Sequence, residues 1–153
     1  MRFCALALVM ASLPLAGDAG IPPPSVFEGY PTPAPILRGL IMTESGGRAS
    51  AIGDDGLSRG AGQLNRKFDK ERAFWWGRFD PLNIHDSIRI TSRLFEANMK
   101  ALLMTENIID PSTWEEKRVR IAIGAHRQGL WGALRDGPTE WYVKRVMKYG
   151  GME

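Results

Sequence analysis

The sequence predicts a mainly helical domain with one small, irregular hairpin lobe. Apolar residues recur at helical spacing in several stretches, and proline, glycine or capping residues stand at the ends of those stretches. Only residues 48–65 form a long stretch without that spacing, and they are rich in Gly, Asp and Ser. With 153 residues, of which 44% are hydrophobic and 24% charged, the chain has the length and composition of one folded domain. A domain of this size buries about two-thirds of the surface of its unfolded chain.

The first nineteen residues differ from the rest and predict a cleaved export signal. Arg2 precedes a short apolar run over residues 3–15, and the small residue Ala19 closes the segment. The run is shorter than the roughly 20 residues of a membrane span, so we expect no stable span after cleavage; an uncleaved anchor is the alternative. Cys4 is the sole cysteine, so the mature chain would have none. The protein is therefore predicted to be exported, to the periplasm or cell envelope.

The net charge indicates what kind of partner to expect. The formal charge is +3, and removal of residues 1–19 takes away one Arg and one Asp and leaves it unchanged. This charge is too small and too evenly spread to indicate a nucleic-acid partner. It suits a weakly anionic polymer.

The first predicted helix follows a proline-rich segment. Residues 20–35 contain six prolines and predict an extended leader. Pro35 suits the first turn of a helix, and Gly46-Gly47 would end that helix. One face of it carries three apolar residues and one acid, at the spacing of successive helical turns: Leu37, Leu40, Ile41 and Glu44.

The middle of the chain predicts the hairpin lobe and a short helix. We expect a loop and a small hairpin around Asp54-Asp55-Gly56, then a short helix and a loop over residues 66–82 that ends at Asp80-Pro81. This last segment is rich in aromatic residues, and an aromatic cluster is more often core than a ligand platform. They are Phe68, Phe74, Trp75, Trp76 and Phe79.

Three further helices and one helical turn complete the chain. Asn83 predicts the cap of a long helix over residues 84–105, whose buried stripe comprises Ile84, Ile88, Thr91, Leu94, Phe95 and Leu102. Asp110-Pro111 breaks the chain, and residues 113–116 form a capping box. The helix that follows carries Val119, Ala122, Ile123 and His126 on one face and ends at Gly129. A helical turn over residues 130–134 precedes a last helix with Tyr142, Val143, Val146 and Met147 at helical spacing.

Glu44 is the residue that does not fit a purely structural pattern. A charged carboxylate on an apolar helix face is costly to bury, so burial favours its protonated form. A protonated carboxyl is what a general acid needs in order to protonate a glycosidic oxygen. Taken alone, however, an acid near a helix end is more often a solvated terminal residue.

Several motifs around Glu44 together carry a family resemblance. They occur in the order Glu44-Ser45-Gly46-Gly47, Gly60-Ala61-Gly62-Gln63-Leu64-Asn65, Phe79-Asp80-Pro81 and Tyr142-Val143. In this order and spacing the chain resembles the lytic transglycosylase family of the lysozyme superfamily over residues 36–147. It looks closest to the small transglycosylases associated with secretion systems. The resemblance implies a lysozyme-like fold over residues 36–150.

The resemblance also implies a reaction and a substrate. The substrate would be the glycan strands of peptidoglycan, and a secretion apparatus would be a partner. Glu44 would protonate the leaving oxygen and then take a proton from the muramyl C6 hydroxyl as that group closes on C1. The product would be a 1,6-anhydromuramyl end. Residues that match the family's substrate-binding positions are Ser58, Gly60, Gln63, Asn65, His126 and Tyr142.

The sequence departs from the family pattern in two places. Gly62 stands where the family has a bulky residue next to the sugar, and His126-Arg127 stand where it has tyrosine and asparagine. A lone His among apolar residues is more often structural than catalytic. Gly60 and Gly62 fit either a close approach of the glycan or tight-turn geometry. Tyr142 would either reach Glu44 or lie in the core with its hydroxyl hydrogen-bonded to another group.

Two rival functions remain open at this stage. The first is a muramidase. Hydrolysing glycosidases use two carboxylates, so a muramidase would need Asp54 or Asp55 as its second acid. However, two Asp residues before a Gly are more often turn formers than catalytic acids. A catalytically weak glycan-binding module is the other rival. We expect no cofactor and no metal, since His85 and His126 lack ligand spacing and no phosphate-binding glycine loop follows a strand.

Overall fold

The computed structural model describes residues 21–104 and 111–152, and the side chains of residues 111–114 are not described. The predicted export signal, including Cys4, lies outside this part. Within it the chain forms six α-helices: α1 (Ala34–Ser45), α2 (Asp69–Trp76), α3 (Ile84–Met104), α4 (Pro111–Gln128), α5 (Leu130–Asp136) and α6 (Glu140–Gly150). Three short strands, β1 (Ile52–Gly53), β2 (Ser58–Arg59) and β3 (Leu64–Asn65), form an antiparallel sheet in the order β1-β2-β3. The prediction of a mainly helical domain with one small hairpin lobe is therefore confirmed.

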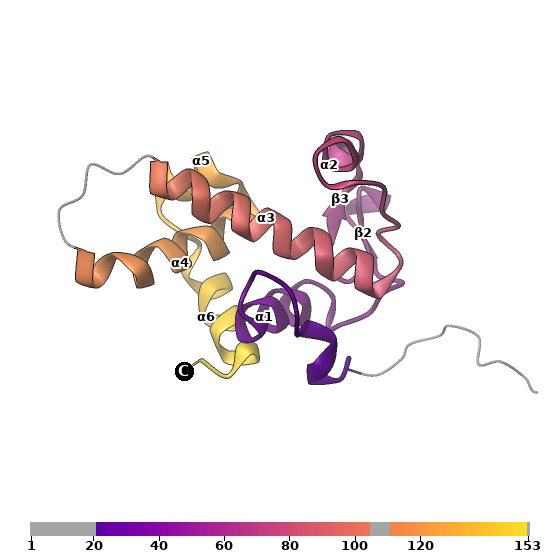
Figure 1. The fold of residues 1–153 in the computed structure, drawn as a ribbon, viewed down its shortest axis with the longest axis horizontal. Coiled ribbons are helices and arrows are strands. Elements are labelled where there is room, and N and C mark those ends of the chain that lie inside the picture. The colour runs from indigo at the N-terminus through magenta and orange to yellow at the C-terminus, as the bar shows by residue number, and fades with distance from the viewer. Residues whose placement is uncertain (1–20, 105–110, 153) are drawn as a thin grey trace, which may run out of the picture.

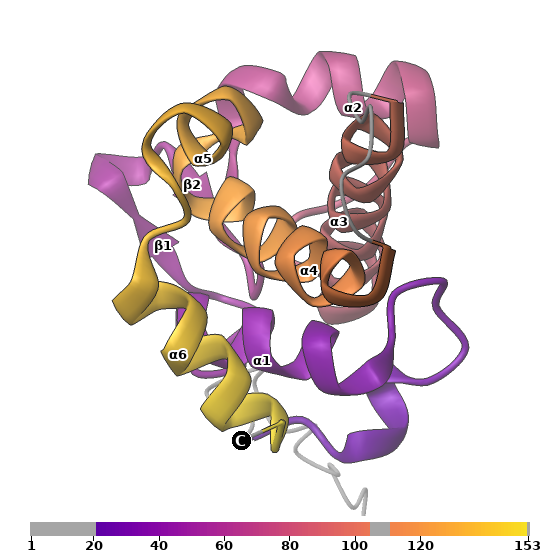
Figure 2. The same ribbon diagram turned by 90° about the vertical axis from the view of Figure 1, so that its left-hand side faces the viewer.

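The helices pack around α4. Figure 2 shows α4 in the middle of the molecule, with α1 and α6 on one side and α2 and α5 on the other. One core cluster joins five helices, α1, α3, α4, α5 and α6. Its buried members are Ile36, Leu40, Phe95, Leu102, Ile121, Ala122, Ile123, Ala125, Ala133, Tyr142, Val143 and Val146. The long helix α3 crosses the molecule and connects this core to the sheet lobe (Figure 1).

Helices α1 and α6 approach each other closely because α1 has a glycine at the crossing point. A Cβ atom on Gly39 would lie 2.2 Å from the carbonyl oxygen of Val146 and 2.9 Å from its Cγ1. Only a residue without a side chain fits there. This close contact fixes the end of α1, where Glu44 lies, against the helix that carries Tyr142.

The proline-rich segment is folded, so the prediction of an extended leader over residues 20–35 is wrong. Pro24–Phe27 form a 3-10 helix, η1. Phe27 is only 1% exposed and packs in a second core cluster with Leu37, Ile41, Ala61 and Ile88. The hydroxyl of Thr32 donates to the Ser92 carbonyl on α3 over 3.1 Å. The prolines shape a turn that covers the core, and α1 begins just after it with Pro35 in its first turn, as predicted.

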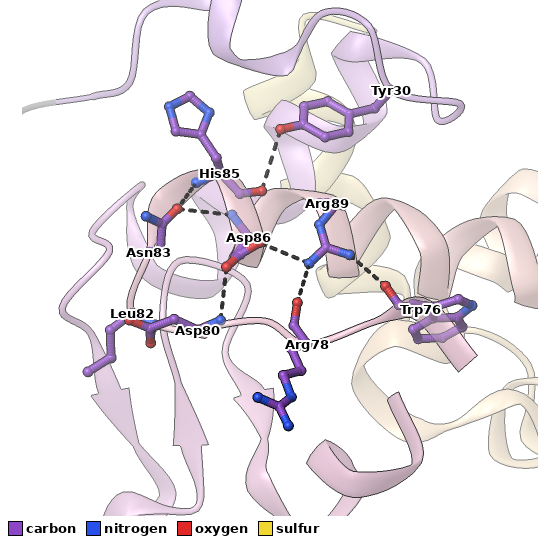
Figure 3. Close-up of polar contacts among 9 residues, drawn as sticks. All are labelled: Tyr30, Trp76, Arg78, Asp80, Leu82, Asn83, His85, Asp86 and Arg89. Atoms are coloured by element: carbon purple, nitrogen blue, oxygen red, sulfur yellow. Dashed lines mark hydrogen bonds and ion pairs between the residues drawn. The ribbon is translucent and has the colours of Figure 1, made fainter. Parts of the chain in front are cut away.

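The start of α3 holds the loop that precedes it (Figure 3). The side-chain oxygen of Asn83 accepts hydrogen bonds from the backbone N–H groups of His85 and Asp86, which confirms Asn83 as the cap. Asp86 in turn accepts from the backbone N–H of Asp80 over 2.9 Å and from the Arg89 guanidinium over 2.9 Å. These hydrogen bonds lower the pKa of the Asp86 carboxyl.

Arg89 connects the same helix to the end of α2. Its guanidinium donates to the carbonyl oxygens of Trp76, at 2.8 Å, and Arg78, at 3.1 Å. Figure 3 shows both carbonyls turned towards Arg89, with the Arg78 side chain pointing away. The loop between α2 and α3 is thus fixed through its backbone, and α2 is held at a defined place beside α3.

The aromatic residues of the segment 66–82 are not core, so that prediction is wrong. Phe74 is 79% exposed and Trp75 is 68% exposed, and Phe68 is exposed as well. The inward face of α2 is occupied by Arg72, which is 8% exposed and donates to the Asn65 carbonyl over 2.7 Å. Because an arginine with its partners fills that face, the aromatic side chains point outward.

The predicted stripe of α3 is largely buried, with Ile88, Thr91, Phe95 and Leu102 inside and Ile84 and Leu94 half-buried. Gly129 ends α4 with a φ of 77°, as predicted, and α5 and α6 lie where the sequence places helices. In the described ranges 21–104 and 111–152, no helix combines the length and apolar character that a membrane crossing requires.

Candidate active site

Glu44 lies in the last turn of α1, and a set of local contacts fixes that end of the helix. Gly46 takes a left-handed conformation with φ 66° and closes α1. The Ser45 hydroxyl donates to the Ile41 carbonyl and accepts from the backbone N–H of Gly47. The C-terminal end of a helix carries partial negative charge, so the negative charge of Glu44 must be stabilised by another group.

That group is the hydroxyl of Tyr142. It donates a hydrogen bond to Oε1 of Glu44 from a position 98 residues further along the chain. Tyr142 is 1% exposed and belongs to the main core cluster, so the donor has a fixed place. Burial raises the pKa of the Tyr142 phenol, and the adjacent negative charge of Glu44 raises it further. The phenol therefore stays protonated and remains a donor.

The second oxygen of the carboxylate is available. Glu44 is half-buried, and in the described part of the chain its Oε2 has no hydrogen-bond partner. Glu44 thus combines one oxygen held by a buried donor with one oxygen open to an incoming group. This is a suitable arrangement for proton transfer to and from a substrate.

A groove of about 860 Å³ runs between the sheet lobe with α2 and the helices α3, α4 and α5. Its walls carry aromatic rings from two sides, Trp75 and Trp76 on α2 and Trp131 on α5. Trp131 is 79% exposed. The polar residues of the groove include Gln63, Asn65, Asn98, His126 and Arg127. A groove with aromatic walls and a few polar groups is suited to an elongated polar molecule.

Arg127 connects the groove to Glu44. It lines the groove, and its guanidinium carbon lies 4.8 Å from the centre of the Trp141 ring and 6.0 Å from that of Tyr142. Tyr142 is the residue that donates to Glu44. Glu44 itself does not line the groove; Tyr142 is the residue through which it is linked to Arg127.

Three of the predicted substrate-binding residues, Gln63, Asn65 and His126, line this groove. His126 Nε2 lies 3.3 Å from the Gly62 carbonyl oxygen. Since a carbonyl only accepts, Nε2 carries the proton, and in the neutral ring Nδ1 is left as an acceptor. His126 therefore has a structural contact and a groove position at once.

The hairpin residues mainly hold the lobe together. The Ser58 hydroxyl is buried and donates to Asp54 over 2.6 Å. The Gln63 amide donates to the carbonyls of Ala51 and Gly60. Asn65 accepts from the backbone N–H of Lys67. Within the described residues neither Ser58 nor Gln63 makes a hydrogen bond to Glu44.

Gly60 and Gly62 are needed for packing of the lobe on α3. A Cβ on Gly60 would lie 1.7 Å from the Pro81 carbonyl oxygen, and one on Gly62 would lie 2.1 Å from Thr91 Oγ1. The Gly62 N–H donates to the Ser87 hydroxyl over 2.9 Å. Both glycines are buried, so their small size serves the interior contact with α3, which the sequence pattern did not indicate.

Asp54 and Asp55 occupy the hairpin turn with left-handed φ values of 49° and 53°. Asp tolerates this conformation better than most residues. Asp54 accepts the Ser58 hydroxyl, which is a turn-stabilising contact. The arrangement matches the role of turn former.

Three residues of the site were missed at the sequence level. Trp75 and Trp131 line the groove, although the first was expected in the core and the second drew no attention. Arg127 was noted only as a departure from a motif. An exposed Trp in a short helix gives no periodic signal, and a cation above an aromatic ring depends on a tertiary contact that the sequence does not show.

Among residues 21–104 and 111–152, no three His, Cys, Asp or Glu side chains stand together in a way that could hold a metal ion. No protein-family model matches the chain, and no curated protein is significantly similar to it in sequence.

Proposed function

We propose that this protein is an exported peptidoglycan lytic transglycosylase of the lysozyme-like fold, with Glu44 as its acid/base. The observation that carries the proposal is the pairing of Glu44 with Tyr142, a carboxylate at the end of a helix and a buried phenol from the last helix. The two residues belong to the motifs that resemble that family. Their meeting beside an aromatic groove supports a glycan-cleaving site.

The chemistry requires one carboxyl group. Protonated Glu44 gives its proton to the glycosidic oxygen as the bond from that oxygen to the muramyl C1 breaks. The C6 hydroxyl oxygen of the same muramyl residue then bonds to C1 and loses its proton to the Glu44 carboxylate. Glu44 ends as it began, no water is consumed, and a 1,6-anhydro ring closes the new end. Tyr142 keeps the carboxyl in place through both proton transfers.

The groove supports a polymeric substrate. Its volume of about 860 Å³ is well above that of one sugar ring and within the range of ligand sites. Trp75 and Trp131 present flat apolar surfaces on which pyranose rings stack, and Asn65 and Asn98 offer amide groups for hydroxyls. Peptidoglycan is also weakly anionic, which suits a chain with a net charge of +3.

The rival muramidase reaction gains little from the geometry. It needs a second carboxylate that faces the substrate. Asp54 is engaged with the Ser58 hydroxyl, and neither Asp54 nor Asp55 lines the groove; the acid that does, Glu71, lies on the α2 wall. The single-carboxylate reaction is therefore the better fit. The proposed site of action is the periplasm or cell envelope, which rests on the pattern of residues 1–19. A secretion apparatus as partner rests on the family resemblance alone.

Mass analysis of the fragments released from purified sacculi tests the proposal. We expect muropeptides with 1,6-anhydromuramyl ends. Reducing muramyl ends would show a muramidase instead, and the absence of soluble fragments together with retained binding to sacculi would show a glycan-binding module.

A further inference from the structure

Arg127 is a groove-lining cation that contacts the ring of Tyr142, the residue that donates to Glu44. It is exposed, and in the described part of the chain its guanidinium forms no hydrogen bond or ion pair; its recorded contacts are with the rings of Trp141 and Tyr142. The arginines nearest to the α2 wall and to the start of α3 are engaged. Arg72 donates to Asn65 and Asp69, and Arg89 to Asp86 and two carbonyls.

The aromatic contacts hold Arg127 in a useful orientation. A guanidinium above a ring interacts through the π face of that ring, whereas its N–H groups form hydrogen bonds in its own plane. Its five N–H donors therefore remain available in a fork that matches a carboxylate. The rings limit the side-chain freedom of Arg127, so less conformational entropy is lost when an anion binds.

Of the two arginines that line the groove, Arg127 is the one without an ion pair among the described residues. Glu71 lines the groove on the α2 side, and the charge of Arg72 there is compensated by Asp69, 3.4 Å away. A negative group at the α2 wall therefore meets repulsion or a neutral surface. At the other end, Arg127 lies 6.0 Å from the centre of the Tyr142 ring, and the Tyr142 hydroxyl donates to Glu44.

We propose that Arg127 binds a carboxylate carried by the sugar at the cleavage point, namely the free lactyl carboxylate of a muramyl residue. This inference rests on the proposed function, because the bond cleaved there is at C1 of that sugar and its lactyl group is attached to the same ring. Strands without stem peptides carry the lactyl group as a free acid, whereas a stem peptide converts it to a neutral amide. The preferred substrate class is thus peptide-free, carboxylate-bearing glycan.

Binding measurements on a variant without turnover test this preference. The ligands are a muramyl-containing tetrasaccharide with free lactyl carboxylates and the same tetrasaccharide with each carboxyl converted to a methylamide. They are titrated against the Glu44→Gln protein by calorimetry. We expect the free acid to bind about tenfold more tightly, which corresponds to about 1.4 kcal/mol, and the difference to shrink at high salt.

Substitutions assign the difference to Arg127. In the same background Arg127→Gln should abolish the preference, because the free acid loses about tenfold more affinity than the methylamide, and Arg127→Lys should keep part of the preference. Arg93→Gln is the matched control, since it removes one exposed positive charge from α3 outside the groove and should keep the full preference. Equal affinities for the two ligands in the Arg127-containing protein would overturn the proposal, as would an equal loss for both ligands in Arg127→Gln.

A third ligand separates the sources of the carboxylate. The tetrasaccharide with stem peptides has amidated lactyl groups but free peptide carboxylates, and it should bind like the methylamide. If it bound as tightly as the free acid and lost that affinity in Arg127→Gln, Arg127 would recognise stem peptide and the proposal would be wrong. A preference for the free acid without release of anhydro ends from sacculi would instead contradict the proposed function while it upheld the role of Arg127.

Discussion

Replacement of Tyr142 by Phe isolates the contact that positions Glu44. The change removes one hydroxyl and keeps the ring, which is 1% exposed and packs in the main core. A hydrogen bond to a charged group contributes about 1.5–3 kcal/mol, but water can replace part of it at the half-buried Glu44. We therefore expect Tyr142→Phe to lower the free energy of unfolding by about 1–2 kcal/mol, and Tm by roughly 2–8 °C.

A double-mutant cycle attributes this loss to the contact itself. With Glu44→Ala as the second change, unfolding in urea should give a coupling energy of about 1 kcal/mol or more between the two positions. Tyr149→Phe is the matched control on the same helix, because in the described part of the chain the Tyr149 hydroxyl has no hydrogen-bond partner. It should change stability by less than about 0.5 kcal/mol.

The same variant should also report on the reaction. If Tyr142 only positions the carboxyl, Tyr142→Phe should lower kcat about tenfold, or about 1.4 kcal/mol in the barrier, with KM little changed. A coupling energy below about 0.3 kcal/mol, together with an unchanged kcat, would refute the reasoning.

Two further predictions concern the frame that holds the site. Gly39→Ala should destabilise the protein by about 1–3 kcal/mol in urea unfolding, because its Cβ would lie 2.2 Å from the Val146 carbonyl oxygen. Gly132→Ala is the control and should be neutral or stabilising, because its Cβ would meet only atoms at 3.5 Å or more. Equal effects of the two changes on stability would contradict the packing argument. The pKa of Asp86 is lowered in the folded state, so its contribution to stability is present above the ordinary carboxyl pKa of 3.8 and is lost as the pH falls below it. Thermal unfolding should therefore show that Asp86→Asn lowers Tm at pH 7 and has a smaller effect at pH 2.5, and a larger effect at the lower pH would show that the sign is wrong.

The helices were predictable because their ends carry local signals. Pro35, Gly46, Asn83 and Gly129 each act through the backbone of their own turn, so a single sequence displays them. The hairpin lobe was predictable for the same reason, since the turn at Asp54-Asp55 needs left-handed conformations that few residues tolerate.

Features that depend on tertiary partners were not predictable in this way. The aromatic residues of α2 were assigned to the core because aromatic side chains favour burial, but Arg72 occupies the inward face of that short helix. The proline-rich segment gave no sign that Phe27 would fill a gap beside α1. Gly60 was read as a turn or substrate glycine, and its φ of 78° agrees with a turn. The close approach of Pro81 to Gly60 and of Thr91 to Gly62, from distant segments, could not be predicted.

In the candidate site, too, the local features were predictable from the sequence and the features that depend on tertiary contacts were not. The apolar face of α1 made Glu44 conspicuous, and the motifs suggested Tyr142 as its partner. The groove with Trp75, Trp131 and Arg127 arises from the sheet lobe, α2, α3, α4 and α5, which come together only on folding.

The most direct test of the account is the product pattern of the wild-type protein beside that of Glu44→Gln, measured by mass spectrometry of digested sacculi. Loss of general acid/base catalysis typically slows a reaction about 10²–10⁴-fold. We predict 1,6-anhydromuramyl ends with the wild-type protein and at least a hundredfold fewer with a Glu44→Gln protein that remains folded. Near-equal release of fragments by the folded variant would contradict the role of Glu44 and with it the proposed function.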